Sequence, residues 1–202
     1  QEQKKFSVFI SGGDTVFSNK LSFTIISVGF SKNIIFRNKA KLNDDIYVTG
    51  NLGDSFIGLQ ILKKKIDLKK DLNDYFKKKY YLPDLQSNLT NKLLSFANTS
   101  IDISDGLVTD LDKLINKQNL SYEIYLNDIP VSKNLKKLID MSVIKKKSCV
   151  SNGDDYQILF TASRSKSRII YNVGKSLGIK ISKIGKIRAR KANPQIYDEK
   201  NR

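Results

Sequence analysis

The segment at residues 101–107, with the sequence IDISDGL, combines residue types that can bind a metal ion and a phosphate group. Alternating apolar and polar residues predict a strand that ends at Ser104, and the apolar spacing that follows predicts a helix. Asp102 and Ser104 then share a face, with Asp105 in the first helical turn. Unpaired backbone N–H groups at the helix start suit phosphate, whereas two carboxylates repel it unless Mg²⁺ lies between them. We interpret this segment as a candidate metal–phosphate site.

The same residues also fit a purely structural interpretation. Ser104 is a favourable helix N-cap residue, and Asp105 favours the positive end of a helix without any ligand. The heptapeptide alone does not separate the two interpretations. For Asp54 and Asp155, which lie in two other turns, we expect the structural role of a cap or turn former.

The residue types that are absent exclude several kinds of site. The 202 residues include no His and one Cys, Cys149, which excludes zinc sites, Ser–His and Cys–His nucleophile systems and an internal disulfide. Any bound metal must therefore have oxygen ligands, which favours Mg²⁺. A lone Cys fits a reducing compartment, and we see no signal peptide or membrane-length apolar run. These features predict a cytoplasmic protein with no membrane partner.

The formal net charge of +16 raises the question of nucleic-acid binding. The lysines occur in short, scattered runs on the polar faces of predicted helices or in loops. Lys, Asn and Ile are abundant together, as in proteins from A+T-rich genomes. We therefore expect no nucleic-acid partner, and keep a basic nucleic-acid-binding domain as the alternative from another functional class.

The order of predicted elements indicates a mixed architecture. Strands are predicted at 6–10, 21–30, 45–49, 101–104, 122–126, 156–161 and 179–187. Helices are predicted at 55–65, 71–80, 86–97, 104–117, 132–140 and 165–177. An offset in the last strand, at Gly185, suggests a β-bulge. Because strands and helices do not alternate strictly, we predict the α+β class.

Four turns in this order combine aspartate with a glycine in the turn or directly after it: residues 12–15, 50–54, 102–105 (followed by Gly106) and 153–155. Such turns let the backbone approach phosphate groups while carboxylates hold cations. The sequence contains neither a P-loop nor the protein-kinase motifs. A phosphate-handling enzyme of another kind is therefore indicated.

These turns carry a resemblance to a known family. The motifs GGDT (12–15), DDIYVTGNLGDS (44–55), IDISDGL (101–107) and NGDDYQILFT (152–161) resemble those of thiamine-monophosphate kinases, in the same order. That family lies in the superfamily of aminoimidazole ribonucleotide synthetase and selenophosphate synthetase. The resemblance implies a PurM-like two-domain architecture. Residues 1–36 would be the end of the ATP-binding N-terminal domain, and 37–202 most of the C-terminal mixed α/β domain.

The resemblance also implies an activity and a set of site residues. The activity is ATP-dependent phosphorylation of thiamine monophosphate to thiamine diphosphate, with several Mg²⁺ ions between ATP and the substrate phosphate. The residues implied to bind the nucleotide are Gly13, Asp14, Arg37 and Ser104. Those implied to bind Mg²⁺ are Asp14, Asp102 and Asp105. Asp154 would contact the substrate, and no residue is assigned as a nucleophile or general base.

The sequence departs from the family pattern at several places. Asn152, Asp154 and Gln157 replace a usual Gly, Glu and Glu, and the family's residues before GGDT are missing. We therefore expect a fragment that is inactive alone, from a full-length parent that forms a homodimer. Two alternatives remain: another ATP-using enzyme of the superfamily, and a non-catalytic relative.

Overall fold

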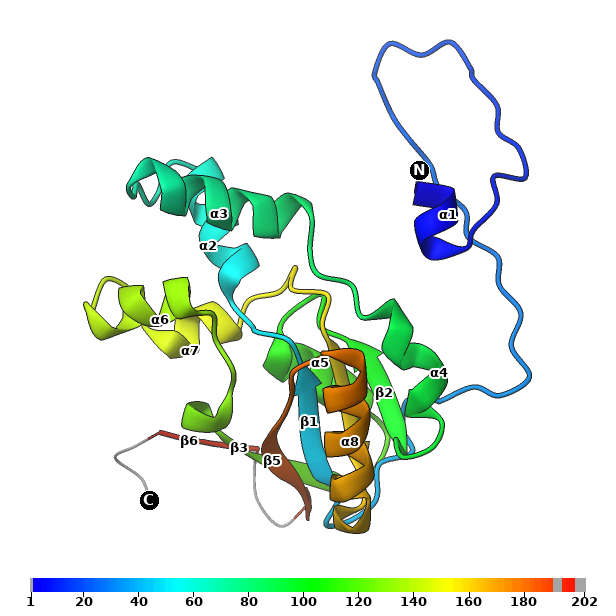
Figure 1. The fold of residues 1–202 in the computed structure, drawn as a ribbon, viewed down its shortest axis with the longest axis vertical. Helices are drawn as coiled ribbons and strands as arrows, with labels where there is room; N and C mark the ends of the chain where they lie inside the picture. Colours follow the sequence, from blue (N-terminus) through cyan, green and yellow to red (C-terminus); the bar gives the residue numbers. More distant parts are fainter. Residues whose placement is uncertain (1, 191–193, 199–202) are drawn as a thin grey trace. The chain divides into compact units, whose positions relative to one another are not determined.

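The computed structural model describes residues 2–190 and 194–198, and its contacts divide the chain into two units, Gln1–Ile34 and Ile35–Arg202. In the described part of the first unit, α1 (Glu2–Phe6) is the only helix or strand (Figure 1). The division after Ile34 falls close to the boundary predicted at residue 36. Whether the first unit is the end of an ATP-binding domain stays a prediction.

The two strands predicted in the first unit, at 6–10 and 21–30, are wrong. The residues that follow α1 form no strand, and apolar side chains such as Phe23, Ile25 and Phe30 are exposed. A β-strand requires a neighbouring strand to satisfy its backbone groups, and the described first unit provides none. The alternating pattern alone was therefore insufficient to produce a strand.

The second unit is built on one six-stranded sheet with the order β2-β4-β1-β5-β3-β6. The strands are β1 (Asp45–Thr49), β2 (Thr99–Asp102), β3 (Leu120–Tyr125), β4 (Ile158–Ala162), β5 (Ile181–Ala189) and β6 (Gln195–Tyr197). All neighbouring pairs are antiparallel except β3 and β6. The bulge predicted near Gly185 is confirmed, because the register between β1 and β5 shifts there. The predicted α+β class is also confirmed.

The helices of the second unit follow the predicted order with shifted ends, but the helix predicted at 86–97 is wrong in length, because only a 3-10 turn and the short α4 form there. They are α2 (Asp54–Leu62), α3 (Lys70–Tyr81), α4 (Thr90–Leu93), α5 (Leu107–Leu114), α6 (Lys133–Asp140), α7 (Lys146–Val150) and α8 (Ser167–Leu177), with 3-10 turns at Ser87–Leu89, Leu126–Asp128 and Arg164–Lys166. The sequence patterns did not predict α7 or β6. Among the described residues, no helix is both long and apolar enough to span a membrane.

Three groups of buried side chains hold the second unit together. Ile46 and Val48 of β1 lie in the group that includes Leu111 of α5, whereas Tyr47 lies in the group that includes Ile170 of α8. This alternation places α5 and α8 on opposite faces of the sheet. The third group packs α2, α3, α6 and α7 against one another beside the sheet (Figure 1). The turns between β2 and α5 and between α7 and β4 carry most of the candidate site.

Candidate functional site

The turn at residues 103–106, which joins β2 to α5, carries the central predicted residues. Its first residue, Ile103, is fully buried and anchors the turn in the core. The side chains of Asp102 and Asp105 are exposed, and Ser104 is half-buried. The structure therefore presents two carboxylates and a hydroxyl near the surface close to the start of a helix, as predicted. The placement of Asp105 in the first helical turn is wrong, because α5 begins at Leu107 with Gly106 as its N-cap residue.

The backbone N–H groups of this turn, however, are not free to bind phosphate. The N–H groups of Ser104, Asp105 and Gly106 all donate to Oδ2 of Asp110, over 3.0, 2.9 and 3.1 Å. Asp110 lies on α5 and is completely buried. The expectation of unpaired N–H groups at this helix start is wrong, because a carboxylate from the next turn of the chain already occupies them.

The structural alternative for this turn also needs correction. Ser104 does not cap α5: the N-cap residue is Gly106, at φ 117°, and it makes no side-chain cap hydrogen bond. Asp105 instead forms an ion pair with Lys113, which also pairs with Asp110 over 3.0 Å. These two carboxylates raise the pKa of the Lys113 ammonium. The polar side chains of the turn are thus held by α5 and do not cap it.

The turn at residues 152–156 packs directly against the β2–α5 turn. The backbone N–H of Asp154 donates to Ser104 O, and that of Tyr156 to Ile103 O, both over 2.9 Å. A Cβ atom on Gly153 would approach Ser104 O to 1.9 Å, so only glycine permits this contact. Asp154 therefore lies beside the β2–α5 turn, although 49 residues separate it from Asp105 in sequence.

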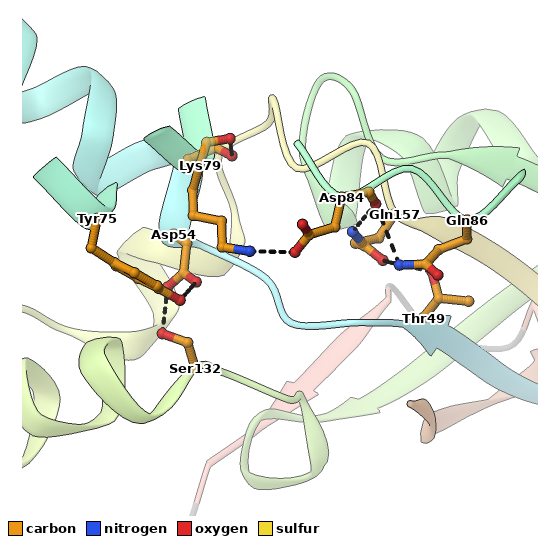
Figure 2. A network of polar contacts seen from close by, with 9 residues as sticks. Thr49, Asp54, Tyr75, Lys79, Asp84, Gln86, Ser132 and Gln157 are labelled. Atoms are coloured by element: carbon orange, nitrogen blue, oxygen red, sulfur yellow. Dashed lines mark hydrogen bonds and ion pairs between the residues drawn. The ribbon is translucent and has the colours of Figure 1, made fainter. Parts of the chain in front are cut away.

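A buried polar network lies behind these turns (Figure 2). Asp54, at the start of α2, accepts hydrogen bonds from Tyr75 Oη (2.8 Å) and Ser132 Oγ (2.7 Å). Ser132 in turn caps α6, because its Oγ accepts the N–H of Leu135 over 3.0 Å. Burial raises the pKa of Asp54, while the two hydroxyl donors lower it. Asp54 thus joins α2, α3 and α6 and does not cap α2.

Asp155 provides the link between this network and the turn at 152–156. Its Oδ2 accepts the N–H of Gly53, the N-cap residue of α2, over 2.8 Å. Burial raises the pKa of Asp155 to about 7, and the Gly53 hydrogen bond opposes this shift. The expectation that Asp155 acts as a cap or turn former is confirmed.

A pocket beside the network is too small to hold a substrate. Its volume is about 30 Å³, and its lining includes Asp54, Asp155, Lys79, Asp84 and Gln157. Small-molecule pockets typically have a volume of about 300 Å³ or more. Lys79 and Asp84 form an ion pair at this pocket (Figure 2). The network is therefore a support for the turns and not itself a substrate pocket.

Three other predicted residues, Gly13, Asp14 and Arg37, are not part of these turns. Gly13 and Asp14 are exposed in the first unit, where Asp14 Oδ1 accepts the N–H of Thr15 over 2.8 Å. Arg37 is exposed in the second unit. Its neighbour Phe36 accepts a hydrogen bond from Thr99 of β2 through its carbonyl oxygen, and its neighbour Asn38 donates its backbone N–H to Leu114 O of α5. These contacts place Arg37 at the opposite ends of β2 and α5 from Ser104. The roles of these three residues stay predictions.

The donor set at the β2–α5 turn fits Mg²⁺ in part. Asp102 and Asp105 offer exposed carboxylate oxygens, and Mg²⁺ commonly binds one or two carboxylates together with substrate phosphates. Within residues 2–190 and 194–198, no three His, Cys, Asp or Glu side chains form a group that could hold a metal ion. The described second unit therefore supplies two carboxylates, and the remaining ligands would come from elsewhere.

Comparison with known proteins agrees with the motif pattern. The thiamine-monophosphate kinase of Buchnera aphidicola subsp. Schizaphis graminum is 36% identical over 91% of this chain and 57% of that protein. The enzyme from Buchnera aphidicola subsp. Acyrthosiphon pisum is 34% identical over 98% of this chain and 62% of that protein. The chain is related to the thiamine-monophosphate kinases. It spans about three fifths of the length of these relatives, and no family model matches it.

Solved structures give the same answer for the fold. Thiamine-monophosphate kinase from Stenotrophomonas maltophilia K279a matches 82% of this chain with a TM-score of 0.71 at 24% identity, and this chain covers 52% of it. The structure described as AaThiL complexed with AMPPCP and TMP matches 82% of this chain with a TM-score of 0.67 at 25% identity, and this chain covers 50% of it. The PurM-like fold implied by the resemblance is confirmed.

Proposed function

We propose that the protein to which this chain belongs phosphorylates thiamine monophosphate to thiamine diphosphate, with ATP as the phosphoryl donor. The observation that carries this proposal is the 34–36% identity to thiamine-monophosphate kinases over at least 91% of the chain. The geometry supports it, because the turns at 103–106 and 152–156 lie side by side. Together with Asp102 at the end of β2, these two turns carry the predicted contact residues Ser104, Asp105 and Asp154.

The residue roles are part of the same proposal. Asp102 and Asp105 hold Mg²⁺, with Asp14 as a further ligand, and Asp154 contacts thiamine monophosphate. Gly13, Asp14, Arg37 and Ser104 contact ATP. When bound, Mg²⁺ would neutralise the charges of ATP and of the acceptor phosphate. Because phosphoryl transfer needs positioning and charge neutralisation more than a protein nucleophile, a site without His suits it.

The environment proposed for the protein follows the sequence expectations. We propose a cytoplasmic location, a homodimer for the full-length protein, and no nucleic-acid partner. A second enzyme of the same superfamily remains the alternative function. The structures described as HypE share the fold at 13–16% identity, so the fold alone does not distinguish between acceptors.

The test is a kinase assay on a hybrid protein. This chain would replace the matching part of the Haemophilus influenzae thiamine-monophosphate kinase, which is 34% identical to it over 56% of that enzyme. We expect thiamine diphosphate to form from ATP, Mg²⁺ and thiamine monophosphate. The D102N hybrid should lose at least about a hundredfold in rate, because it lacks a metal ligand. The control hybrid D71N, which changes an exposed Asp on α3, should retain the rate.

Two results would contradict the proposal. A folded hybrid that transfers phosphate to another acceptor would favour a different enzyme of the superfamily. A D102N hybrid with unchanged rate would remove the metal role of Asp102. The same assay on the chain alone tests the expectation that it is inactive without the rest of the protein, and measurable turnover there would refute that expectation.

A further inference from the structure

We propose that Asp110 is a positioning residue that holds the β2–α5 turn in the conformation that presents Asp102, Ser104 and Asp105 to ligands. The inference rests on the proposed function for the identity of those ligands. It rests on the structure alone for the way in which Asp110 holds the turn. No contact of Asp110 with a ligand is involved, because its side chain is completely buried beneath the turn.

The hydrogen bonds of Asp110 fix three consecutive residues of the turn. A single carboxylate oxygen, Oδ2, accepts the N–H groups of Ser104, Asp105 and Gly106 over 2.9–3.1 Å. Convergent backbone N–H groups of this kind form a concave anion-binding site. Because a carboxylate of the chain fills this site, the turn is formed without a bound phosphate. The orientation of the backbone also determines where the Ser104 and Asp105 side chains point.

The position of Asp110 in the fold makes this bracing effective. Asp110 lies in the first turn of α5, and its own N–H donates to Gly106 O over 2.9 Å. Gly106 is at φ 117°, and a Cβ atom there would approach Ser151 O to 2.3 Å. The turn is therefore held by α5 on one side and by the segment around residues 151–154 on the other. Loss of Asp110 would release one of these two restraints.

The other carboxylate oxygen of Asp110, Oδ1, links the hydrogen-bonded turn to the exposed carboxylate of Asp105. Oδ1 pairs with the ammonium of Lys113 over 3.0 Å, and the same ammonium pairs with Asp105. Lys113 thus balances the charge of the buried carboxylate and restrains the Asp105 side chain. A cation that binds Asp105 competes with this ammonium, whereas the bonds from Asp110 to the backbone stay in place.

The test compares D110A and D110N with a matched control, D112N. Asp112 lies on the same helix, but its carboxylate accepts Tyr122 Oη over 2.9 Å and has no hydrogen bond to the turn. Backbone hydrogen exchange, followed by NMR, reports the three N–H groups directly. We expect exchange at residues 104–106 to rise at least tenfold in D110A. The rise should be smaller in D110N, whose amide oxygen still accepts. Rates in D112N and in α8 should not change.

A second measurement connects the brace to ligand binding. We expect D110N to raise the dissociation constant for Mg²⁺·ATP at least fivefold, measured by calorimetry, with D112N within twofold of the unmodified chain. Wild-type exchange rates at residues 104–106 in D110A would overturn the proposal. So would equal weakening of Mg²⁺·ATP binding by D110N and D112N. If the unmodified chain binds no Mg²⁺·ATP, as expected if binding needs the rest of the protein, the exchange rates alone decide the role of Asp110, and the hybrid assay decides the proposed function.

Discussion

Asp110 and Asp155 are buried carboxylates that accept backbone N–H groups from glycine-containing turns. Asp110 accepts the N–H groups of Ser104, Asp105 and Gly106, and Asp155 accepts the N–H group of Gly53. In each case a buried carboxylate satisfies backbone N–H groups of the turn that leads into a helix. Burying a carboxylate is unfavourable unless such donors compensate for the lost hydration. At the residue scale, the site therefore depends on acidic side chains that need not contact a ligand.

The D155N variant tests the energetic cost of burying Asp155. Burial raises its pKa from the ordinary value of 3.8 to about 7, so the folded protein binds a proton more tightly than the unfolded chain. The contribution of this tighter proton binding to the free energy of unfolding is fully present below pH 4 and is lost as pH rises through 7. Asn resembles the protonated acid, so D155N should match the unmodified protein near pH 4. At pH 8 it should be more stable by up to about 4 kcal/mol.

Urea unfolding at pH 4.5 and pH 8 measures this difference. The control D71N changes an exposed carboxylate and should show no such dependence on pH. A D155N variant that is destabilised equally at both pH values would show that the ionised carboxylate is needed for the hydrogen bond to Gly53. That result would exclude the raised pKa of Asp155.

At the scale of elements, the sequence predicted the helices and strands whose own residues show a clear apolar periodicity and a residue type that ends the element. β1 has its predicted bounds, α8 ends at Gly178 as predicted, and the bulge near Gly185 is present. The strand at 21–30 had an equally clear pattern and did not form, because it has no partner strand in the described first unit. Isolated periodicity thus predicts a strand only where the fold supplies its neighbour.

The sequence predicted which residues form the candidate site better than it predicted the hydrogen bonds between them. The closeness of residues 152–156 to the β2–α5 turn depends on β2 and β4 pairing across the sheet, which no local pattern specifies. The brace from Asp110 was missed for a similar reason. An Asp in the first turn of a helix ordinarily indicates a favourable helix-dipole interaction, and only the folded turn shows what its carboxylate accepts.

The contact between the two turns can be tested with G153A. A Cβ atom at position 153 would lie 1.9 Å from Ser104 O, so the turns must separate or distort. We expect the free energy of unfolding to fall by about 1–3 kcal/mol. Urea unfolding measures this change, and G29A is the control, because a Cβ atom there meets nothing within 4 Å. Equal stability of G153A and the unmodified protein would show that the two turns are not held in close contact.

At the scale of the whole molecule, the chain combines a folded second unit with a first unit that has little regular structure. The second unit carries the PurM-like fold and five predicted site residues, Arg37, Asp102, Ser104, Asp105 and Asp154, of which Asp102 and Asp105 are proposed to bind Mg²⁺. Gly13 and Asp14 lie in the first unit. The relatives are longer than this chain, which covers 56–62% of the first three. The second unit therefore does not contain all of the residues proposed to bind ligands.

Paramagnetic broadening by Mn²⁺, a substitute for Mg²⁺, tests most directly whether the carboxylates at the β2–α5 turn gather a divalent cation beside nucleotide phosphates. The amide signals of the chain would be recorded with Mn²⁺ alone and with Mn²⁺ and ATP. We predict broadening centred on residues 102–105 that strengthens with ATP and disappears in the D102N/D105N double variant. Broadening centred on other carboxylates, or unchanged in the double variant, would contradict the account.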